Sequence, residues 1–458
     1  MKTKLSLAIT LALIVILVLA MPVLSAPPGS WITDFTLFNL SNSASANVII
    51  TRYTQCSGSS CATDAGTTVV SPTIAAGGSF YYNPVSDPSF PSGFAGSIAV
   101  SSDQPLAGTV TLANNLTGVD YASDAYSAVS APATLTYLPI VLRWAAWSTR
   151  ITVQNTGATN ATVTIDYVGS GAPSATTISN LPPNMMAMVD LSDAGTFNGS
   201  ATVTSTNAVA VVVEEYKTTG GVLVTYNGIP SSMAGSPIYL PGYIDQGPWA
   251  TDMTIVSAGG SGTVTVTFAG TSDSLTGPVS ASSSPYLNRY SSSLPSGWTG
   301  TFPTTYYGSA TVTSTTPVVV AYNISNSGAG GTGNLAEGYV GFSASQGAMT
   351  VVVPLIEHMY SNWNTTFSVQ SLDGTPAILS MSYSGNIAPL CSPCSVTMSA
   401  ASQTFNQTVD GHVPTGFIGG VKIVSDKNIV VIADQANTMT ATYIGGDSAA
   451  GFSGFPSP

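Results

Sequence analysis

A short pattern that recurs four times along the chain places the strongest constraint on its fold. The clearest copy is Gly-Ser-Ala-Thr-Val-Thr-Ser at 308–314, followed after a short turn by the run Pro-Val-Val-Val-Ala-Tyr at 317–322. The other copies of the first segment lie at 96–102, 199–205 and 419–425. Small or hydroxyl residues alternate with apolar ones at a period of two, which is typical of a strand with one buried face. We therefore expect a hairpin in each copy and four similar domains.

A second repeated feature is a tryptophan that opens a strand-like segment. These residues are Trp31, Trp147, Trp249 and Trp363, at spacings of 116, 102 and 114 residues. Such a period is too long for one rung of a solenoid and matches a β-sandwich domain of about 100 residues. The chain is therefore expected to be a string of β-sandwiches.

A proline lies eight or nine residues before three of the tryptophans, at Pro139, Pro241 and Pro354. Because proline cannot donate to a ladder, the strand that carries it is expected at a sheet edge, as the first strand of its domain. With seven or eight short strands per repeat, we predict an all-β chain of four tandem immunoglobulin-like β-sandwich domains after a signal peptide. The predicted ranges are 1–26 for the signal peptide and 27–132, 133–234, 235–346 and 347–458 for the four sandwich repeats.

The N-terminus has the features of an export signal. Lys2 and Lys4 precede an apolar run at 11–19, and small residues follow at Ser25 and Ala26. This order predicts a cleaved signal peptide; an uncleaved anchor is the weaker alternative, because the apolar run is short and prolines follow it. No later segment is long and apolar enough to span a bilayer. We expect a secreted protein, extracellular or at the cell surface, without a transmembrane helix in its mature chain.

The first repeat differs from the others in what precedes its tryptophan. Counting back nine residues from Trp31 reaches Pro22, so the counterpart of the proline-bearing edge strand is expected at 21–24. Cleavage after residue 20 keeps this strand, whereas the slightly favoured cleavage after residue 25 or 26 discards it. The sheet edge left open would then accept a strand from a partner, or the apolar tail at 449–456 of a neighbouring molecule.

Charge is scarce along the whole chain. Charged residues make up 7% of it, with 9 Lys and Arg against 21 Asp and Glu and a net charge of −12, which falls to −14 without Lys2 and Lys4. An acidic surface repels phosphate backbones, so nucleic-acid binding is not expected. A surface this poor in charge is expected to be covered by glycans or by other protein.

Four cysteines form two close pairs. Cys56 and Cys61 lie in the first repeat, and Cys391 and Cys394 at an equivalent place in the fourth. In an exported protein this spacing predicts two local disulfides, each worth about 2 kcal/mol because the closed loop is small. The spacing of 391–394 also occurs in thiol-redox sites, but those need a strand-to-helix setting, so a structural disulfide is favoured.

The sequence offers little to catalysis. His358 and His412 are the only histidines, and neither has the spacing of a metal or triad site. Glu214 and Glu215 are adjacent, so on a strand they face opposite sides of the sheet and cannot act as a glycosidase pair. The acidic loops at 120–124 and 190–193 lack the ligand density of a calcium loop and are expected to be solvated turns. We predict no catalytic, cofactor-binding or metal-binding residue, no cofactor and no enzyme activity.

Two features of the sequence bear on sugars: aromatic residues near loops and Asn-x-Ser/Thr sequons. Aromatic residues near loops, Trp298, Tyr306 and Tyr307, form either a sugar-stacking platform or, as we favour, packing at the end of a sandwich. Asn-x-Ser/Thr sequons are candidate glycosylation sites, although a chain this rich in Ser, Thr and Asn also produces sequons by chance. These sequons begin at Asn39, Asn115, Asn160, Asn198, Asn323, Asn364 and Asn406.

Taken together, the proline edge strand, the Trp-led strand and the repeated Gly-Ser-Ala pattern resemble the tandem immunoglobulin-like repeat proteins that bacteria secrete to their surfaces. The resemblance implies a structural or adhesive role and transfers no functional residue. We expect a non-enzymatic extracellular structural protein that self-associates as a subunit of a surface layer, sheath or filament. The alternative is a secreted adhesin or carbohydrate-binding repeat protein, and a secreted hydrolase is a weaker third.

Overall fold

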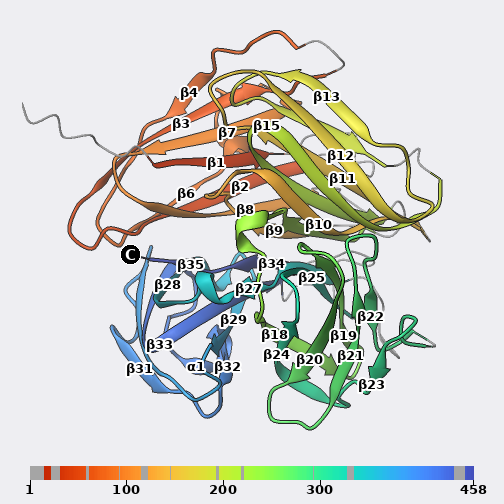
Figure 1. Ribbon diagram of the computed structural model, residues 1–458. Helices are drawn as coiled ribbons and strands as arrows, with labels where there is room; N and C mark the ends of the chain where they lie inside the picture. The colour runs from red at the N-terminus through yellow and green to blue at the C-terminus, as the bar shows by residue number, and fades with distance from the viewer. Residues whose placement is uncertain are drawn as a thin grey trace, which may run out of the picture.

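The computed structural model describes residues 15–21, 31–57, 61–91, 93–114, 122–144, 146–191, 195–217, 221–291, 293–326, 335–437 and 449–457 (Figure 1). Nearly all regular structure in these residues is antiparallel β-sheet, which confirms the predicted all-β sandwich class. The exceptions are 3-10 turns at Pro84–Ser86, Ser231–Met233 and Ala344–Gln346 and one helical turn, α1, at Gln407–Asp410. None of the helices in this part of the chain has the length and apolar character needed to cross a membrane.

The second repeat illustrates the arrangement of strands. One sheet has the order β13, β12, first half of β15, β10, β17, and the other has the order β14, β11, second half of β15, β16. The strands are β10 (Ala133–Arg143), β11 (Trp147–Asn155), β12 (Ala161–Ser170), β13 (Thr176–Leu181), β14 (Met186–Asp190), β15 (Phe197–Lys217), β16 (Leu223–Asn227) and β17 (Ile229–Pro230). We call the sheet that contains the Trp-led strand β11 and the last long strand β16 the inner sheet, and the other the outer sheet.

The first repeat has the same two sheets. Its outer sheet has the order β4, β3, β7, β1 and its inner sheet the order β6, β2, β8, β9. The strands are β1 (Val15–Met21), β2 (Trp31–Asn39), β3 (Ala46–Thr54), β4 (Thr67–Val70), β5 (Thr73–Ile74), β6 (Ser79–Tyr82), β7 (Gly96–Ser102), β8 (Leu106–Asn114) and β9 (Ser123–Ser127).

The third and fourth repeats also follow this order. Their inner sheets run β22, β19, β25, β26 and β32, β29, second half of β33, β34. The third repeat contains β18 (Ile238–Gln246), β19 (Trp249–Ser257), β20 (Gly262–Phe268), β21 (Ser274–Val279), β22 (Tyr286–Asn288), β23 (Thr299–Gly300), β24 (Tyr306–Ser314), β25 (Val318–Ser325), β26 (Ala336–Val340) and β27 (Phe342–Ser343). The fourth contains β28 (Ala348–Tyr360), β29 (Trp363–Ser371), β30 (Ile378–Gly385), β31 (Cys394–Thr397), β32 (Ser402–Asn406), β33 (Phe417–Asn437), β34 (Ala449–Ser453) and β35 (Phe455–Pro456).

The strand order is related to the immunoglobulin order but differs at both ends of the repeat. In an immunoglobulin constant domain the first strand pairs with the second and the last pairs with the sixth. Here the first strand of the second repeat, β10, pairs with the first half of β15, and the second half of β15 pairs with the Trp-led strand β11. Compared with the immunoglobulin order, β10 and the second half of β15 therefore each lie in the sheet where the other would be expected.

The expectation of a hairpin in each copy of the repeated pattern is wrong. In β15 the first run pairs with β12, with Val203 opposite Ile165, whereas the second run pairs with β11, with Val213 opposite Ile151. The chain crosses from the outer to the inner sheet at 205–208 and does not fold back along one sheet. Two consecutive β-branched runs therefore belong to the two layers of one sandwich.

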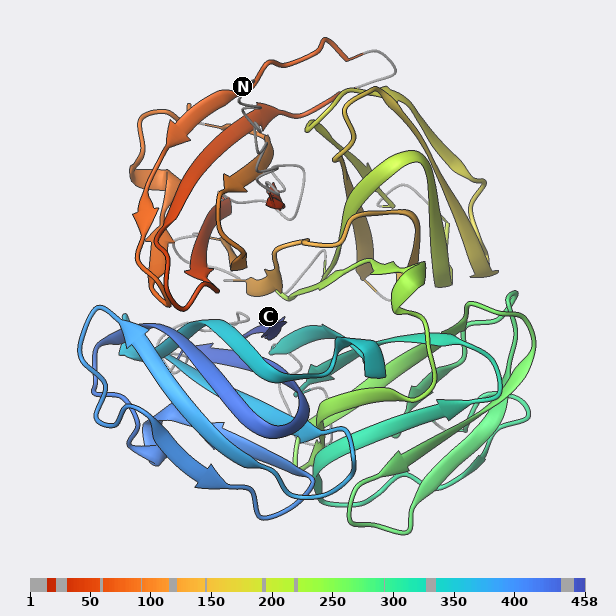
Figure 2. The same ribbon diagram turned by 60° about the vertical axis from the view of Figure 1, so that its left-hand side comes forward.

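The four repeats, expected from the sequence as a string of β-sandwiches, close into a ring. Strands β9, β16, β26 and β34, the last long strand of each repeat, meet at the centre, and each contacts the next around the circle (Figure 2). The reason is that the inner sheets are apolar on both faces. Val212 and Tyr216 of β15 belong to the core of the first repeat, and Ile432 of β33 belongs to the core of the third.

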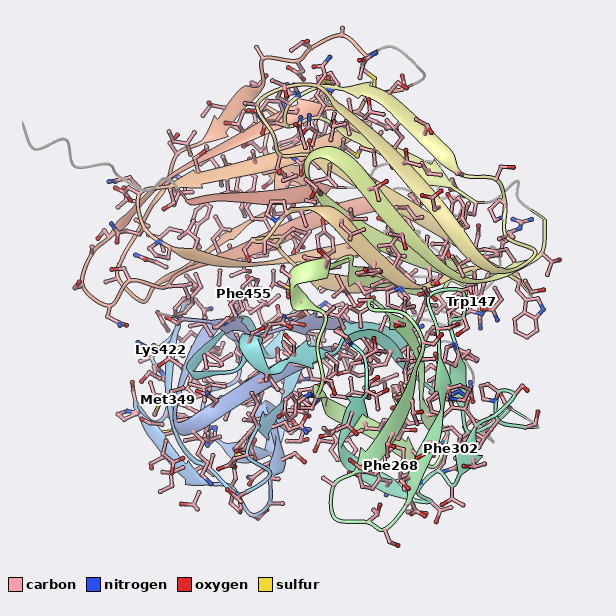
Figure 3. All side chains as sticks on the ribbon, in the orientation of Figure 1. Trp147, Phe268, Phe302, Met349, Lys422 and Phe455 are labelled. Carbon is pink, nitrogen blue, oxygen red and sulfur yellow. A yellow bond between two sulfur atoms is a disulfide. The ribbon has the colours of Figure 1, made fainter. Side chains whose placement is uncertain are left out.

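The seam between the fourth and first repeats closes the ring. Phe455 of β35 packs with Phe38, Ala107 and Val352, and its side chain lies at the boundary between the two repeats (Figure 3). The sequence interpretation was that glycans or other protein cover a surface so poor in charge. Part of that cover is supplied by the chain itself, because each inner sheet is buried against a neighbouring repeat.

Both ends of the described chain lie inside sheets. Strand β1 pairs antiparallel with β7, with Met21 opposite Gly96, the position that β10, β18 and β28 take in the later repeats. Strand β1 is therefore the first edge strand of the first repeat, and it lies within the predicted signal peptide. The sequence predicted this strand at 21–24, so it begins earlier than expected. Residues 22–24 lie outside the described residues. The tail at 449–456 pairs with β33 and β28 of its own repeat, and Phe452 is buried. It is therefore not a free donor strand, which corrects that expectation.

Candidate functional site

The central junction brings the same position of all four repeats together. These residues are Ala125, Thr225, Gly338 and Gly451, each followed by an aromatic residue. Small side chains are needed because the strands approach closely. A Cβ on Gly338 would lie 2.3 Å from the carbonyl oxygen of Thr225, and one on Gly451 would lie 2.7 Å from the ring of Tyr339.

Asp124 joins three of the central strands. Its Oδ1 accepts hydrogen bonds from the backbone N–H of Ala125 and of Gly451, both at 2.7 Å, and its Oδ2 accepts from the backbone N–H and the hydroxyl of Thr225. Burial raises the pKa of this carboxyl, and the hydrogen bonds act in the opposite direction. The sequence interpretation placed Asp124 in a solvated turn, and this is wrong because the residue is fully buried at the junction.

The second repeat contains a buried ion cluster at the face it turns to the first repeat. Arg150 is 2% exposed and contacts the carboxylates of Glu214 at 3.3 Å and Asp190 at 3.2 Å. The hydroxyl of Tyr216 donates to Asp190 at 2.8 Å, and the guanidinium lies 5.7 Å from the Tyr216 ring. Burial raises the pKa of Glu214 to about 7, and Arg150 opposes this. The expectation of a solvated loop at 190–193 therefore fails for Asp190, while 192–194 lie outside the described residues.

The equivalent position in the fourth repeat is hollow. Strand register places Thr366 where the second repeat has Arg150, Asp434 in place of Glu214, and Asn406 in place of Asp190. Ala436 takes the place of Tyr216. Two large side chains are thus replaced by small ones, and a pocket of about 400 Å³ lies here between the third and fourth repeats.

The third repeat supplies the opposite wall of this pocket. Trp249, Tyr307 and Tyr339 contribute aromatic surface, and Glu337 contributes a second carboxylate that is 5% exposed. The Tyr339 hydroxyl donates to one oxygen of Glu337 at 2.5 Å. Burial, reinforced by Asp434, raises the pKa of Glu337 well above its usual range, and burial raises the pKa of Asp434 to about 7. No Lys or Arg of the described residues forms a salt bridge with either carboxylate.

A wider groove continues from the pocket along the same pair of repeats. It has a volume of about 950 Å³ and shares Tyr307 with the pocket. Hydroxyl side chains dominate its walls, and Gln370 and Ser309 each present a buried oxygen that has no hydrogen-bond partner among the described residues.

The predicted cysteine pairs lie away from this pocket. In the structure Cys56 is bonded to Cys61 and Cys391 to Cys394, each within its own repeat. The ring nitrogens of His412 lie close to the second pair, with all ligand atoms of the three residues within 4.8 Å. A disulfide leaves no thiolate to bind a metal, so this group is not a metal site while it is oxidised.

The candidate glycosylation asparagines differ in accessibility. Asn39 is fully buried and its amide donates to the carbonyl oxygens of Ala44 and Ile74, so it serves the turn that follows its strand. Asn323 and Asn364 are also buried, and Asn115 lies outside the described residues. Only Asn160, Asn198 and Asn406 are both described and exposed.

The remaining residues that the sequence singled out are mostly packing residues. Glu214 and Glu215 contact different partners, Arg150 in their own repeat and Asn323 in the third, so they do not act together. Trp298 and Tyr306 belong to the core of the third repeat, in agreement with sandwich packing. Tyr307 is 48% exposed and is the one member of this group that lines the pocket.

Comparisons with known proteins add little to this geometry. No protein-family model matches the chain, and no curated protein matches it. Among solved structures, the partial N-terminal region of an enterococcal surface protein is similar over 77% of this chain and 90% of its own length, at 8% identity and a TM-score of 0.18. A TM-score this low does not establish a shared fold.

Sequence reasoning missed the pocket because it lies between two repeats. An alignment of the repeats on their tryptophans would have revealed one signal: the third residue after each Trp is Asp34, Arg150, Asp252 and Thr366. Only the second repeat carries a cation there.

Proposed function

We propose that this protein is a non-enzymatic extracellular structural protein that self-associates into a surface layer, sheath or filament. The observation that carries the proposal is the character of the outer sheets. Several outward residues of the outer sheets in the second and third repeats are threonines, namely Thr162 and Thr204 in the second repeat and Thr263, Thr267 and Thr313 in the third. A β-surface with few charged residues lacks the charges that keep free proteins apart, so it suits packing against further protein.

The signal peptide predicted at the N-terminus supports the proposed extracellular location. The likeness to the enterococcal surface protein is too weak to support the proposal. Negative-stain electron microscopy and light scattering of the purified protein, from low to high salt, test it. We expect ordered layers, sheaths or filaments; discrete single particles under every condition would contradict the proposal.

A pair of variants locates the assembly surface. Thr162→Lys with Thr204→Lys places two charges on one outer sheet without disturbing the core, because both positions are exposed. We expect weaker assembly from this variant than from Ser86→Lys with Ser282→Lys, which adds the same charge at exposed loop positions. Equal assembly of the two variants would exclude the outer sheet of the second repeat as the contact surface.

The alternative is a secreted adhesin or carbohydrate-binding protein, and the groove of about 950 Å³ favours it. Hydroxyl and amide groups beside an exposed tyrosine are the usual means of binding sugars. Screening of the protein against immobilised glycans tests this role. Binding that is lost in Tyr307→Ala would support the alternative, and the absence of binding to any glycan, together with assembly, would leave the structural role.

A further inference from the structure

The pocket between the third and fourth repeats is best understood by comparison with the second repeat. There, an internal guanidinium occupies the equivalent position, where Arg150 lies between Glu214 and Asp190. In the fourth repeat the acidic side chain is still present as Asp434, but the residue opposite it is Thr366. The fourth repeat therefore has a carboxylate at this position but no arginine opposite it.

The pocket is also large enough to hold a cation in place of the missing arginine side chain. Because Ala436 stands where the second repeat has Tyr216, the pocket is larger than the volume of the missing guanidinium alone. Glu337 reaches the same space from the third repeat, so two carboxylates face one pocket. Two like charges held at close range in a buried site are unfavourable unless a cation or a shared proton separates them.

The walls of the pocket distinguish an organic cation from a metal ion. Ile244, Ile324 and Ile432 line it together with Trp249 and Tyr307. Apolar and aromatic surface stabilises the carbon skeleton and the delocalised charge of an organic cation, whereas Ca²⁺ requires six to eight oxygen ligands.

We propose that this pocket binds a small organic cation, with its guanidinium or ammonium head between Asp434 and Glu337 and its apolar part against Trp249 and Tyr307. The bound head occupies the position that Arg150 occupies in the second repeat. This site is independent of the proposed assembly through the outer sheets, because it lies at the contact between inner and outer sheets within one molecule.

Isothermal titration calorimetry of the full-length protein with n-butylguanidine tests the proposal. The measurement is made at pH 8, above the value of about 7 to which burial raises the pKa of Asp434. We expect saturable binding of one molecule per chain. The neutral isostere n-butylurea is expected to bind at least about tenfold more weakly, because a charged hydrogen bond to a carboxylate is lost. Equal binding of the two compounds, or no saturable binding of either, would overturn the proposal. Tighter binding of Ca²⁺ than of butylguanidine would assign the pocket to a metal ion instead.

Two variants locate the site. Asp434→Asn is expected to weaken butylguanidine binding at least about tenfold, whereas Asp166→Asn, which changes an exposed aspartate of the second repeat, leaves it unchanged. Thr366→Arg places a guanidinium from the chain itself into the pocket, as in the second repeat, and is expected to abolish binding while raising the melting temperature. If Thr366→Arg does not fold, the comparison of Asp434→Asn with Asp166→Asn still decides, and equal affinities of those two variants would refute the site.

Discussion

At the scale of single residues, the closed ring buries carboxyl groups, and Glu357 is the clearest example. It is 8% exposed, it lies near Asp34 of the first repeat, and it accepts a hydrogen bond from the amide of Gln435 at 2.5 Å. Burial, reinforced by Asp34, raises the pKa of Glu357 to about 8, and burial raises that of Asp34 to about 6. All four glutamates of the chain are buried, at 3%, 1%, 5% and 8% exposure.

Because the pKa values of these carboxyls are raised, we predict that the free energy of unfolding falls as pH rises. A carboxyl with a raised pKa in the folded state binds more protons there than in the unfolded chain, so its stabilising effect is complete below about 4.5 and is lost as pH rises through the folded value. For Glu357 the loss occurs between about pH 4.5 and 8, at up to about 1.4 kcal/mol per pH unit.

We therefore expect the melting temperature to fall from pH 5 to pH 8, and Glu357→Gln to reduce that fall. Asp166→Asn, at an exposed position, serves as the control and should leave the slope unchanged. A melting temperature that rises steadily over this range would contradict the assignment of buried neutral carboxyls. The sequence indicated that charge is scarce, but it could not show that the few glutamates are internal, because their burial depends on contacts between segments far apart in the sequence, such as Glu357 with Gln435.

At the scale of single elements, the central strands depend on residues without bulk. Gly338→Ala places a Cβ 2.3 Å from the carbonyl oxygen of Thr225, which is backbone and cannot move aside freely. We expect this substitution to lower the free energy of unfolding by about 1–3 kcal/mol, the usual cost of overpacking. Gly195→Ala is the matched control, because nothing lies within 4 Å of its added Cβ. Urea denaturation of both variants measures the difference, and equal stability would show that the central strands are farther apart than in this structure.

Strand β1 links the fold to processing of the N-terminus. A chain that starts at Ala26 lacks β1, so one edge of β7 loses its partner strand. We expect the amides of Ile98 and Val100 in β7 to exchange hydrogen faster in that chain than in one that keeps residues 15–21, while those of Ile165 in the second repeat are unchanged. Hydrogen exchange followed by mass spectrometry measures this, and N-terminal sequencing of the protein from its native source shows which form exists. Equal protection of β7 in both chains would mean that β1 contributes nothing to the sheet.

For the whole molecule, the sequence predicted the strands better than their partners. The tryptophan period and the alternating residues located the Trp-led strands and the first runs of the repeated pattern. The second runs, such as Val209 to Val213, are apolar at consecutive positions, which is the sign of a strand buried on both faces. This apolar run indicated a strand with both faces covered, but a local pattern cannot show which part of the chain covers them. Closure of the ring and the pocket between repeats depend on contacts more than 100 residues apart in sequence, such as that of Asp124 with Thr225.

Small-angle X-ray scattering of the monomeric protein tests the closed ring most directly. A compact chain of this length has a radius of gyration of about 22 Å, whereas four sandwiches joined end to end would give about 40 Å. We predict the smaller value, together with a scattering profile that matches the ring of four repeats around β9, β16, β26 and β34. A radius of gyration near the larger value, in a sample shown to be monomeric, would contradict the ring.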